Sequence, residues 1–201
     1  MRTMHLAAAM AAALALSTPA SAGFFDLTLT PYIGGNIGQS SSDITCPTGV
    51  TCDDSDTAWK IFGGLEINEY MSMEVGYADL GEVAYSGAKT GTRETNGMIM
   101  DLVGTYAINP SFILSARGGM NFLNTEVNGT IASTATNPTN NNTGDTDVVW
   151  SFGVGAQYNL TPAVGLRLDW ERFFEAGSSD YNGGTGEADI DLLSAGVVYK
   201  F

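Results

Sequence analysis

Histidine and basic side chains are scarce in this sequence. The 201 residues include one His and eight Lys or Arg, against 22 Asp or Glu, and charged residues make up only 15%. The single histidine, His5, lies in a segment that we expect to be removed. The remaining chain then has no imidazole for general acid–base catalysis. Its acidic balance also disfavours binding to phosphate backbones, so we expect neither a histidine-dependent enzyme nor a nucleic-acid partner.

Long apolar runs are also missing. The longest, LAAAMAAALALS at residues 6–17, has 12 residues and is too short to span a bilayer as a helix. It follows the basic start MRTMH and precedes Ala20-Ser21-Ala22, which is typical of a secretory signal peptide with a small-residue cleavage site. We therefore predict that residues 1–22 are cleaved and that residues 23–201 form one domain, with seven basic residues and a formal charge of −15.

The sequence has only two cysteines, Cys46 and Cys52, in the segment CPTGVTC. An exported chain reaches an oxidising compartment, where such a pair forms a disulfide. A zinc site would need two more ligands, and no histidine remains to supply them. We predict a disulfide that closes a small loop.

The mature chain lacks the 3.6-residue apolar spacing of amphipathic helices and shows period-two alternation instead, which predicts strands. Several of these strands are 10 to 14 residues long, as tilted membrane strands require. The eight segments are 25–38, 57–67, 71–80, 95–108, 112–124, 148–159, 164–173 and 188–201.

The connections between these segments alternate in length. Residues 68–70, 109–110 and 160–163 are short and rich in Asn and Pro, whereas residues 39–56, 81–94, 125–147 and 174–187 are long and polar. Short turns at one rim and long loops at the other are typical of outer-membrane barrels. We predict an all-β fold, an eight-stranded antiparallel transmembrane β-barrel, with periplasmic turns and termini and four extracellular loops.

Each strand has an apolar face and a polar face, and the aromatic residues indicate which one points outward. Aromatic residues gather at both ends of the apolar faces, with aliphatic residues and glycines between them. Two aromatic bands around an aliphatic belt fit two membrane interfaces, whereas the interior of a soluble carrier barrel has no reason for this sorting. The predicted outer girdle is Trp59, Tyr77, Phe122, Trp150 and Trp170, and the periplasmic girdle is Tyr106, Phe112, Tyr158, Tyr199 and Phe201.

The polar faces should then line the lumen. Charges facing lipid near the bilayer midplane would cost about 2–4 kcal/mol for Arg or Lys, whereas opposite charges inside a narrow barrel can pair. Counting from the short turns places Glu74 level with Arg167, and Gly153 and Gly155 leave room beside them. We expect a polar, largely plugged lumen with an ion-pair network of Lys60, Glu66, Glu74, Asp101, Arg117, Arg167, Asp169 and Glu171.

Several segments resemble the OmpA-like transmembrane domain, a family of small porin-like outer-membrane barrels: PYIGGNIGQS, MEVGYADLG, ARGGMNF, GVGAQYNLTPAVGLRLDWERF and SAGVVYKF. The resemblance implies a lumen salt bridge at Glu74 and Arg167. The positions matching a second acidic and a second basic lumen residue hold Gln157 and Val103. The C-terminal alternation is similar to the signal read by the bacterial barrel-assembly machinery, and its residues here are Leu193, Ala195, Val197, Tyr199 and Phe201.

The sequence favours a non-enzymatic outer-membrane protein without a cofactor or metal site, which contributes to envelope structure and displays its loops. Its expected partners are outer-membrane lipid, lipopolysaccharide and, during biogenesis, the barrel-assembly machinery. Two alternatives stay open: a narrow channel for ions or small solutes, and an adhesin that contacts a host or cell-surface ligand through the loops. A carboxylate pair at Asp169 and Glu171 could mimic an active site, but structural ion pairing explains it better.

Overall fold

The fold is a closed ring of antiparallel strands. The computed structural model describes residues 29–46, 48–130, 142–177 and 187–201, and the predicted signal peptide lies outside these ranges. No helix within them is long and apolar enough to cross a membrane. The strands are β1 (Thr30–Asp43), β2 (Val50–Asp53), β3 (Ser55–Asn68), β4 (Met71–Gly87), β5 (Gly91–Asn109), β6 (Phe112–Gly129), β7 (Asn142–Asn159), β8 (Val164–Ala176) and β9 (Ala188–Lys200).

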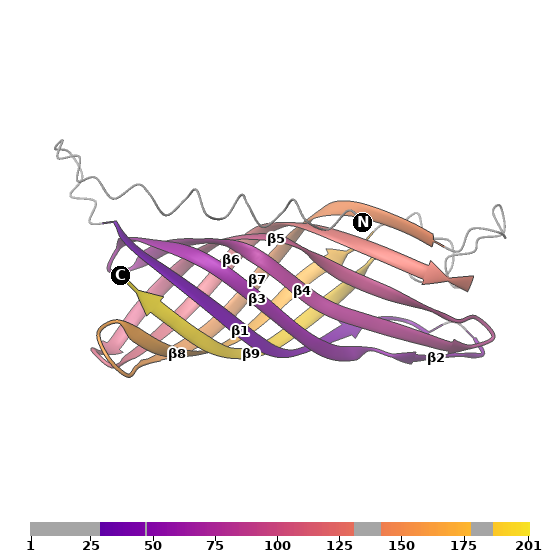
Figure 1. The fold of residues 1–201 in the computed structure, drawn as a ribbon, viewed down its shortest axis with the longest axis horizontal. Helices are drawn as coiled ribbons and strands as arrows, with labels where there is room; N and C mark the ends of the chain where they lie inside the picture. Colours follow the sequence, from indigo (N-terminus) through magenta and orange to yellow (C-terminus); the bar gives the residue numbers. More distant parts are fainter. Residues whose placement is uncertain (1–28, 47, 131–141, 178–186) are drawn as a thin grey trace, which may run out of the picture.

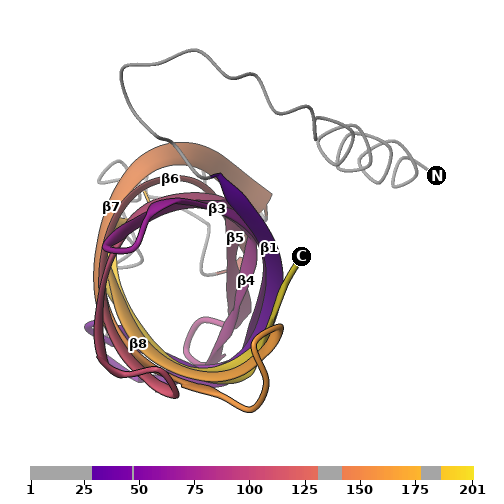
Figure 2. The ribbon, with the colours of Figure 1, turned by 90° about the vertical axis from the view of Figure 1, so that its left-hand side faces the viewer.

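Eight of these strands form the predicted barrel. Neighbours in sequence pair with each other around the ring from β3 to β9, and β1 closes it by pairing with both β3 and β9. Figure 2 shows the closed ring from the end where the C-terminus lies. The ninth strand, β2, lies within the predicted first long loop and pairs with residues 84–87 of β4. It lies at the end of the barrel away from the C-terminus (Figure 1).

Strands β4 to β7 are longer than predicted. The predicted loop at 81–94 is largely strand, because β4 runs on to Gly87 and β5 begins at Gly91. The described ends of the predicted loop at 125–147 are also strand, since β6 and β7 pair as far as Asn128 with Asn142. Figure 1 shows these strands extending beyond the others at the end opposite the C-terminus. Their outward side chains there are polar, such as Glu94 and Glu126. The inward ones are mixed, with Val83 and Val127 beside the buried Arg93 and Thr125.

The alternation of side chains agrees with an outward apolar face. Trp59 and Ile61 point outward and are 42% and 50% exposed, whereas Lys60 between them is 2% exposed. All ten residues of the two predicted girdles lie on this outward face, from Trp59 to Phe201. A barrel with apolar side chains outside and charges inside is inverted relative to a water-soluble protein.

Candidate functional site

The lumen holds a buried cluster of seven charged side chains, which we call the ion cluster. Five strands position it, and every member is at most 6% exposed. Because side chains alternate along a strand, the three members on β8 are spaced two residues apart and all point inward. The cluster consists of Lys60, Glu74, Asp101, Arg117, Arg167, Asp169 and Glu171.

The Glu74 carboxylate forms one end of the ion cluster. It accepts hydrogen bonds from Arg167 Nη1 at 2.6 Å and Nη2 at 3.1 Å, the bidentate geometry that makes such pairs strong. The Tyr32 hydroxyl donates a third bond to it at 2.8 Å. The Arg167 guanidinium also lies 4.9 Å from the centre of the Phe62 ring, a cation–π contact. The Glu74–Arg167 pair, which is expected from counting residues from the short turns, is thus held by Tyr32 at its carboxylate and by Phe62 at its guanidinium.

Arg117 lies at the centre of the ion cluster. Its Nη1 donates to Glu171 at 2.9 Å and to Glu74 at 3.2 Å, and its Nη2 donates to Asp169 at 3.1 Å. Asp101 lies farther away, with Oδ2 4.0 Å from Arg117 Nη1. One guanidinium therefore links carboxylates from three strands, β4, β5 and β8, across the lumen.

Lys60 joins the cluster from β3. Its Nζ lies 2.5 Å from Glu171 Oε2 and 3.8 Å from Asp169 Oδ2. Asn36 on β1 donates to Asp169 at 2.8 Å. Four carboxylates thus face three cations, and neutral polar groups supply further hydrogen bonds, as buried charges require.

Glycines on β7 make room for the cluster. A Cβ at Gly155 would lie 2.2 Å from Asp169 Oδ1, and one at Gly153 would lie 2.7 Å from Glu171 Cγ. Any larger residue at either position would displace a charged side chain from its partners. The ion cluster therefore requires glycine at these two lumen-facing positions of β7.

The lumen differs from the sequence prediction toward the long loops, where apolar side chains predominate although Arg93, Thr95 and Thr125 are also buried. A cluster of inward-facing residues fills it there, which we call the apolar layer: Ala58, Ala78, Leu80, Ile99, Leu123, Val149, Phe173, Ala176, Ile190 and Leu192. Val83, Tyr85 and Val127 form a second apolar group, against which Ile44, Val50 and Cys52 pack. The expectation of a polar lumen describes this half only in part, because apolar side chains are buried there together with polar ones such as Arg93 and Thr95.

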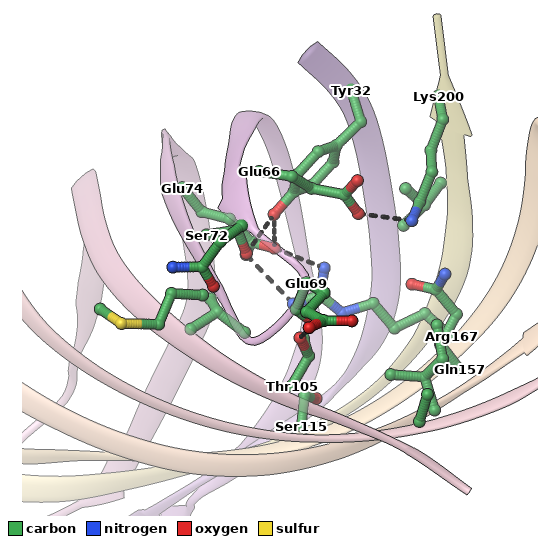
Figure 3. A pocket seen from close by; sticks show the side chains of 16 residues that line it. Tyr32, Glu66, Glu69, Ser72, Glu74, Thr105, Ser115, Gln157, Arg167 and Lys200 are labelled. Atoms are coloured by element: carbon green, nitrogen blue, oxygen red, sulfur yellow. Dashed lines mark hydrogen bonds and ion pairs between the residues drawn. The ribbon is translucent and has the colours of Figure 1, made fainter. Parts of the chain in front are cut away.

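At the short-turn end, the lumen opens into a polar cavity of about 190 Å³. Figure 3 shows Glu74 and Arg167 reaching toward each other from opposite sides, with Tyr32 between them and Glu66 paired with Lys200 nearby. Glu69 and Thr105 also line it, and Thr105 Oγ1 donates to the Glu69 carbonyl at 3.1 Å. We call this cavity the vestibule. The ion cluster closes it on the inside.

Glu66 does not join the ion cluster. Its carboxylate pairs with Lys200, so the structure places it at the rim of the vestibule and corrects its expected position in the network. Its register explains this, since Glu66 pairs with Thr30 and Ser72, close to the short turn at residues 69–70. The predicted disulfide between Cys46 and Cys52 is present. Of the residues in the predicted assembly signal, Tyr199 and Phe201 stack edge to face, with ring centroids 5.3 Å apart.

A second charged group lies on the outer surface, beyond Trp170 and toward the long loops. Arg172 donates to Asp189 at 2.9 Å and to Asp191 at 3.2 Å. The Glu175 amide also donates to Asp189 at 3.0 Å. This amide bond and the Arg172 guanidinium lower the pKa of the Asp189 carboxyl from its ordinary value.

Sequence reasoning missed several residues that build the site. Tyr32, Asn36 and Phe62 carry no charge, so the sequence pattern predicts only that they lie in strands. A signal for the apolar layer was present in adjacent apolar pairs that break the alternation, such as Val148–Val149 and Leu192–Leu193. Such pairs indicate a wall that is apolar on both sides.

The comparisons with known proteins agree with this geometry. The OmpA-like transmembrane domain matches residues 28–201. Outer membrane protein A of Escherichia coli O157:H7 is 30% identical over 70% of this chain and 38% of its own length. The protein of the same name in Shigella flexneri is 28% identical over 97% of this chain and 55% of its own length. The chain thus spans about half or less of these relatives.

Solved structures show the same fold. Neisserial surface protein A superposes with a TM-score of 0.63 at 14% identity, covering 85% of this chain and 97% of its own. OprG, an outer membrane protein of Pseudomonas aeruginosa, has a TM-score of 0.50 at 12% identity, covering 86% and 97%. The architecture, the inverted polarity and the family match over nearly all of the described residues lead to one conclusion: this chain belongs to the OmpA-like transmembrane domain family of outer-membrane β-barrels.

Proposed function

We propose that this chain is a closed, non-enzymatic barrel that contributes to the structure of the outer membrane and displays its long loops outside the cell. In this proposal the short turns and both termini face the periplasm. Lipid and lipopolysaccharide surround the apolar belt, and the barrel-assembly machinery inserts the chain.

One observation carries this proposal: the lumen is filled by two successive layers. The ion cluster bridges the walls above the vestibule, with Arg117 bonded to carboxylates from β4 and β8. Beyond it, the apolar layer packs side chains such as Ile99, Phe173 and Leu192, each at most 2% exposed. A hydrated ion would have to separate the salt bridges, which leaves buried charges unpaired, and then cross a largely apolar region, which removes its water. Both steps cost free energy. This filling speaks against the channel alternative.

Display of loops is supported by the long strands. β4 to β7 continue for several residues past the outward level of Tyr77 and Phe122, and the disulfide-closed segment docks on this extension through β2. A rigid extension of this kind holds the connected segments away from the bilayer surface.

Conductance of the purified barrel in planar bilayers tests the proposal. We expect an electrically silent membrane, with insertion verified by recovering the protein and observing its heat-dependent shift in gel mobility. Stable conductance steps from inserted protein would overturn the sealed lumen. Protease added to intact cells tests the orientation, and cleavage within the long loops is expected.

A further inference from the structure

The outward face of β4, β5 and β6 differs from the rest of the belt. Every methionine after residue 22 lies on it, and each is between 37% and 50% exposed: Met71, Met73, Met98, Met100 and Met120. The outward positions of β1, β3 and β8 carry branched side chains instead, such as Ile33, Ile61 and Leu168. Methionine is unbranched and adaptable, and it is favoured where a surface has to fit a partner.

A hollow of about 400 Å³ lies in the middle of this methionine face. Gly118 lies at its base, where an added Cβ would meet only the Ser151 carbonyl oxygen, at 3.9 Å. Its apolar walls come from four strands and include Met73, Val75, Met100, Leu102, Met120 and Trp150. The hollow is continuous with the lipid-facing belt, so a hydrocarbon chain is the occupant that its environment supplies.

The barrel wall is thin behind the hollow. Within the described strands β5 and β6, the register is the same at Met98 with Phe122 and at Asp101 with Gly119, but the two positions between them form no ladder pair. The Met100 amide donates instead to the Asn121 side chain at 3.3 Å. Asp101 and Ser151 border the hollow from the lumen side. A bound chain would cover this break and shield the ion cluster behind it.

Neutral polar side chains lie above the hollow, toward the long loops. Asn96 on β5, Asn124 on β6 and Thr146 on β7 follow one another in register, and we call them the amide row. Thr146 Oγ1 donates to Asn124 at 3.2 Å, and the Tyr77 hydroxyl donates to Asn96 at 2.8 Å. The side-chain amides of Asn96 and Asn124 each donate one bond, at 3.2 Å, to Glu94 and Glu126, which leaves each amide a second N–H. Asn96 precedes Met100 by four residues, which is about 13 Å along a strand. Amides and hydroxyls can hydrogen-bond to sugar hydroxyls.

We propose that the hollow and the amide row together form a binding site for one lipopolysaccharide molecule. One acyl chain lies in the hollow, and the sugar headgroup lies against Asn96 and Asn124. Small residues that admit close packing are the usual basis of association inside a membrane, where apolar burial alone gives little selectivity. The assignment to lipopolysaccharide rests on the proposed orientation, which puts the amide row in the outer leaflet.

Filling the hollow tests the site. Gly118→Leu projects a side chain into open space, so the barrel should fold while the acyl chain is displaced. Gly63→Leu is the matched control, because Gly63 also faces outward on β3 and an added Cβ would meet only the Tyr32 carbonyl oxygen at 4.0 Å. Heat-dependent gel mobility verifies the fold of both variants.

Native mass spectrometry of barrels extracted from outer membranes in mild detergent gives the readout. We expect wild type and Gly63→Leu to retain one lipopolysaccharide per barrel, and Gly118→Leu to retain at least tenfold less. Equal retention by Gly118→Leu would overturn the site, as would phospholipid or a second copy of the chain as the retained species. The protease test on intact cells distinguishes a wrong orientation from a wrong site.

Discussion

The two halves of the lumen are filled by side chains of different chemical character. Near the vestibule, seven charged side chains fill the space and form ion pairs, with Arg117 bonded to three carboxylates. Toward the long loops, residues such as Ile99 and Phe173 fill it by apolar contact. Charged filling depends on every partner being present, because a lone buried charge is costly, whereas apolar filling loses stability in proportion to the volume removed.

The largest effect is expected from breaking the ion cluster. Arg117→Met keeps much of the side-chain volume but leaves Glu74, Asp169 and Glu171 without their shared cation. We expect a loss of about 3–5 kcal/mol in the free energy of unfolding, measured by urea titration of the barrel in lipid vesicles. Arg172→Met is the control, since this arginine pairs at the surface and its loss should cost much less than that of Arg117. Equal losses for the two would contradict a special role for the buried cluster.

A similar or smaller loss is expected from the apolar layer. Ile99→Ala removes buried volume next to Leu123 and Val149 and should cost about 2–5 kcal/mol in the same unfolding measurement. Met98→Ala next to it changes the lipid-facing side, where acyl chains can fill the space, so its cost should be clearly lower. The comparison between the halves would fail if the outward substitution cost as much as the inward one.

The smallest effect concerns charge outside the barrel. Arg172→Gln removes the guanidinium from Asp189, whose pKa should then rise toward its ordinary value while the Glu175 amide bond remains. A lowered pKa stabilises the fold above the unfolded-state value and loses that contribution as the pH falls through the folded-state value. The variant should therefore be slightly less stable than wild type near neutral pH, with the difference vanishing in acid. Carboxyl NMR titration measures the pKa, and an unchanged pKa would contradict the assignment.

The barrel and its inside-out polarity were predictable because alternation and the positions of Trp150, Tyr158 and Tyr199 carry the signal directly. The extension of β4 to β7 beyond the predicted strand ends was not predictable. Polar outward residues such as Glu94 and Glu126 are typical of loops, and they occur in these strands once the strands have left the bilayer. The individual ion pairs in the lumen were only partly predictable. Counting from the turns paired Glu74 with Arg167, but the central role of Arg117 depends on side-chain reach across the lumen, which a linear pattern does not encode.

The pair between Lys200 and Glu66 has a consequence for the order of assembly. Lys200 is on the last strand and Glu66 is on β3, and β1 lies between those two strands in the ring. The contact therefore crosses the seam where the first and last strands meet. It can form only after β9 has docked in register. A time-resolved probe of the Lys200–Glu66 pair would therefore report when the ring closes during folding.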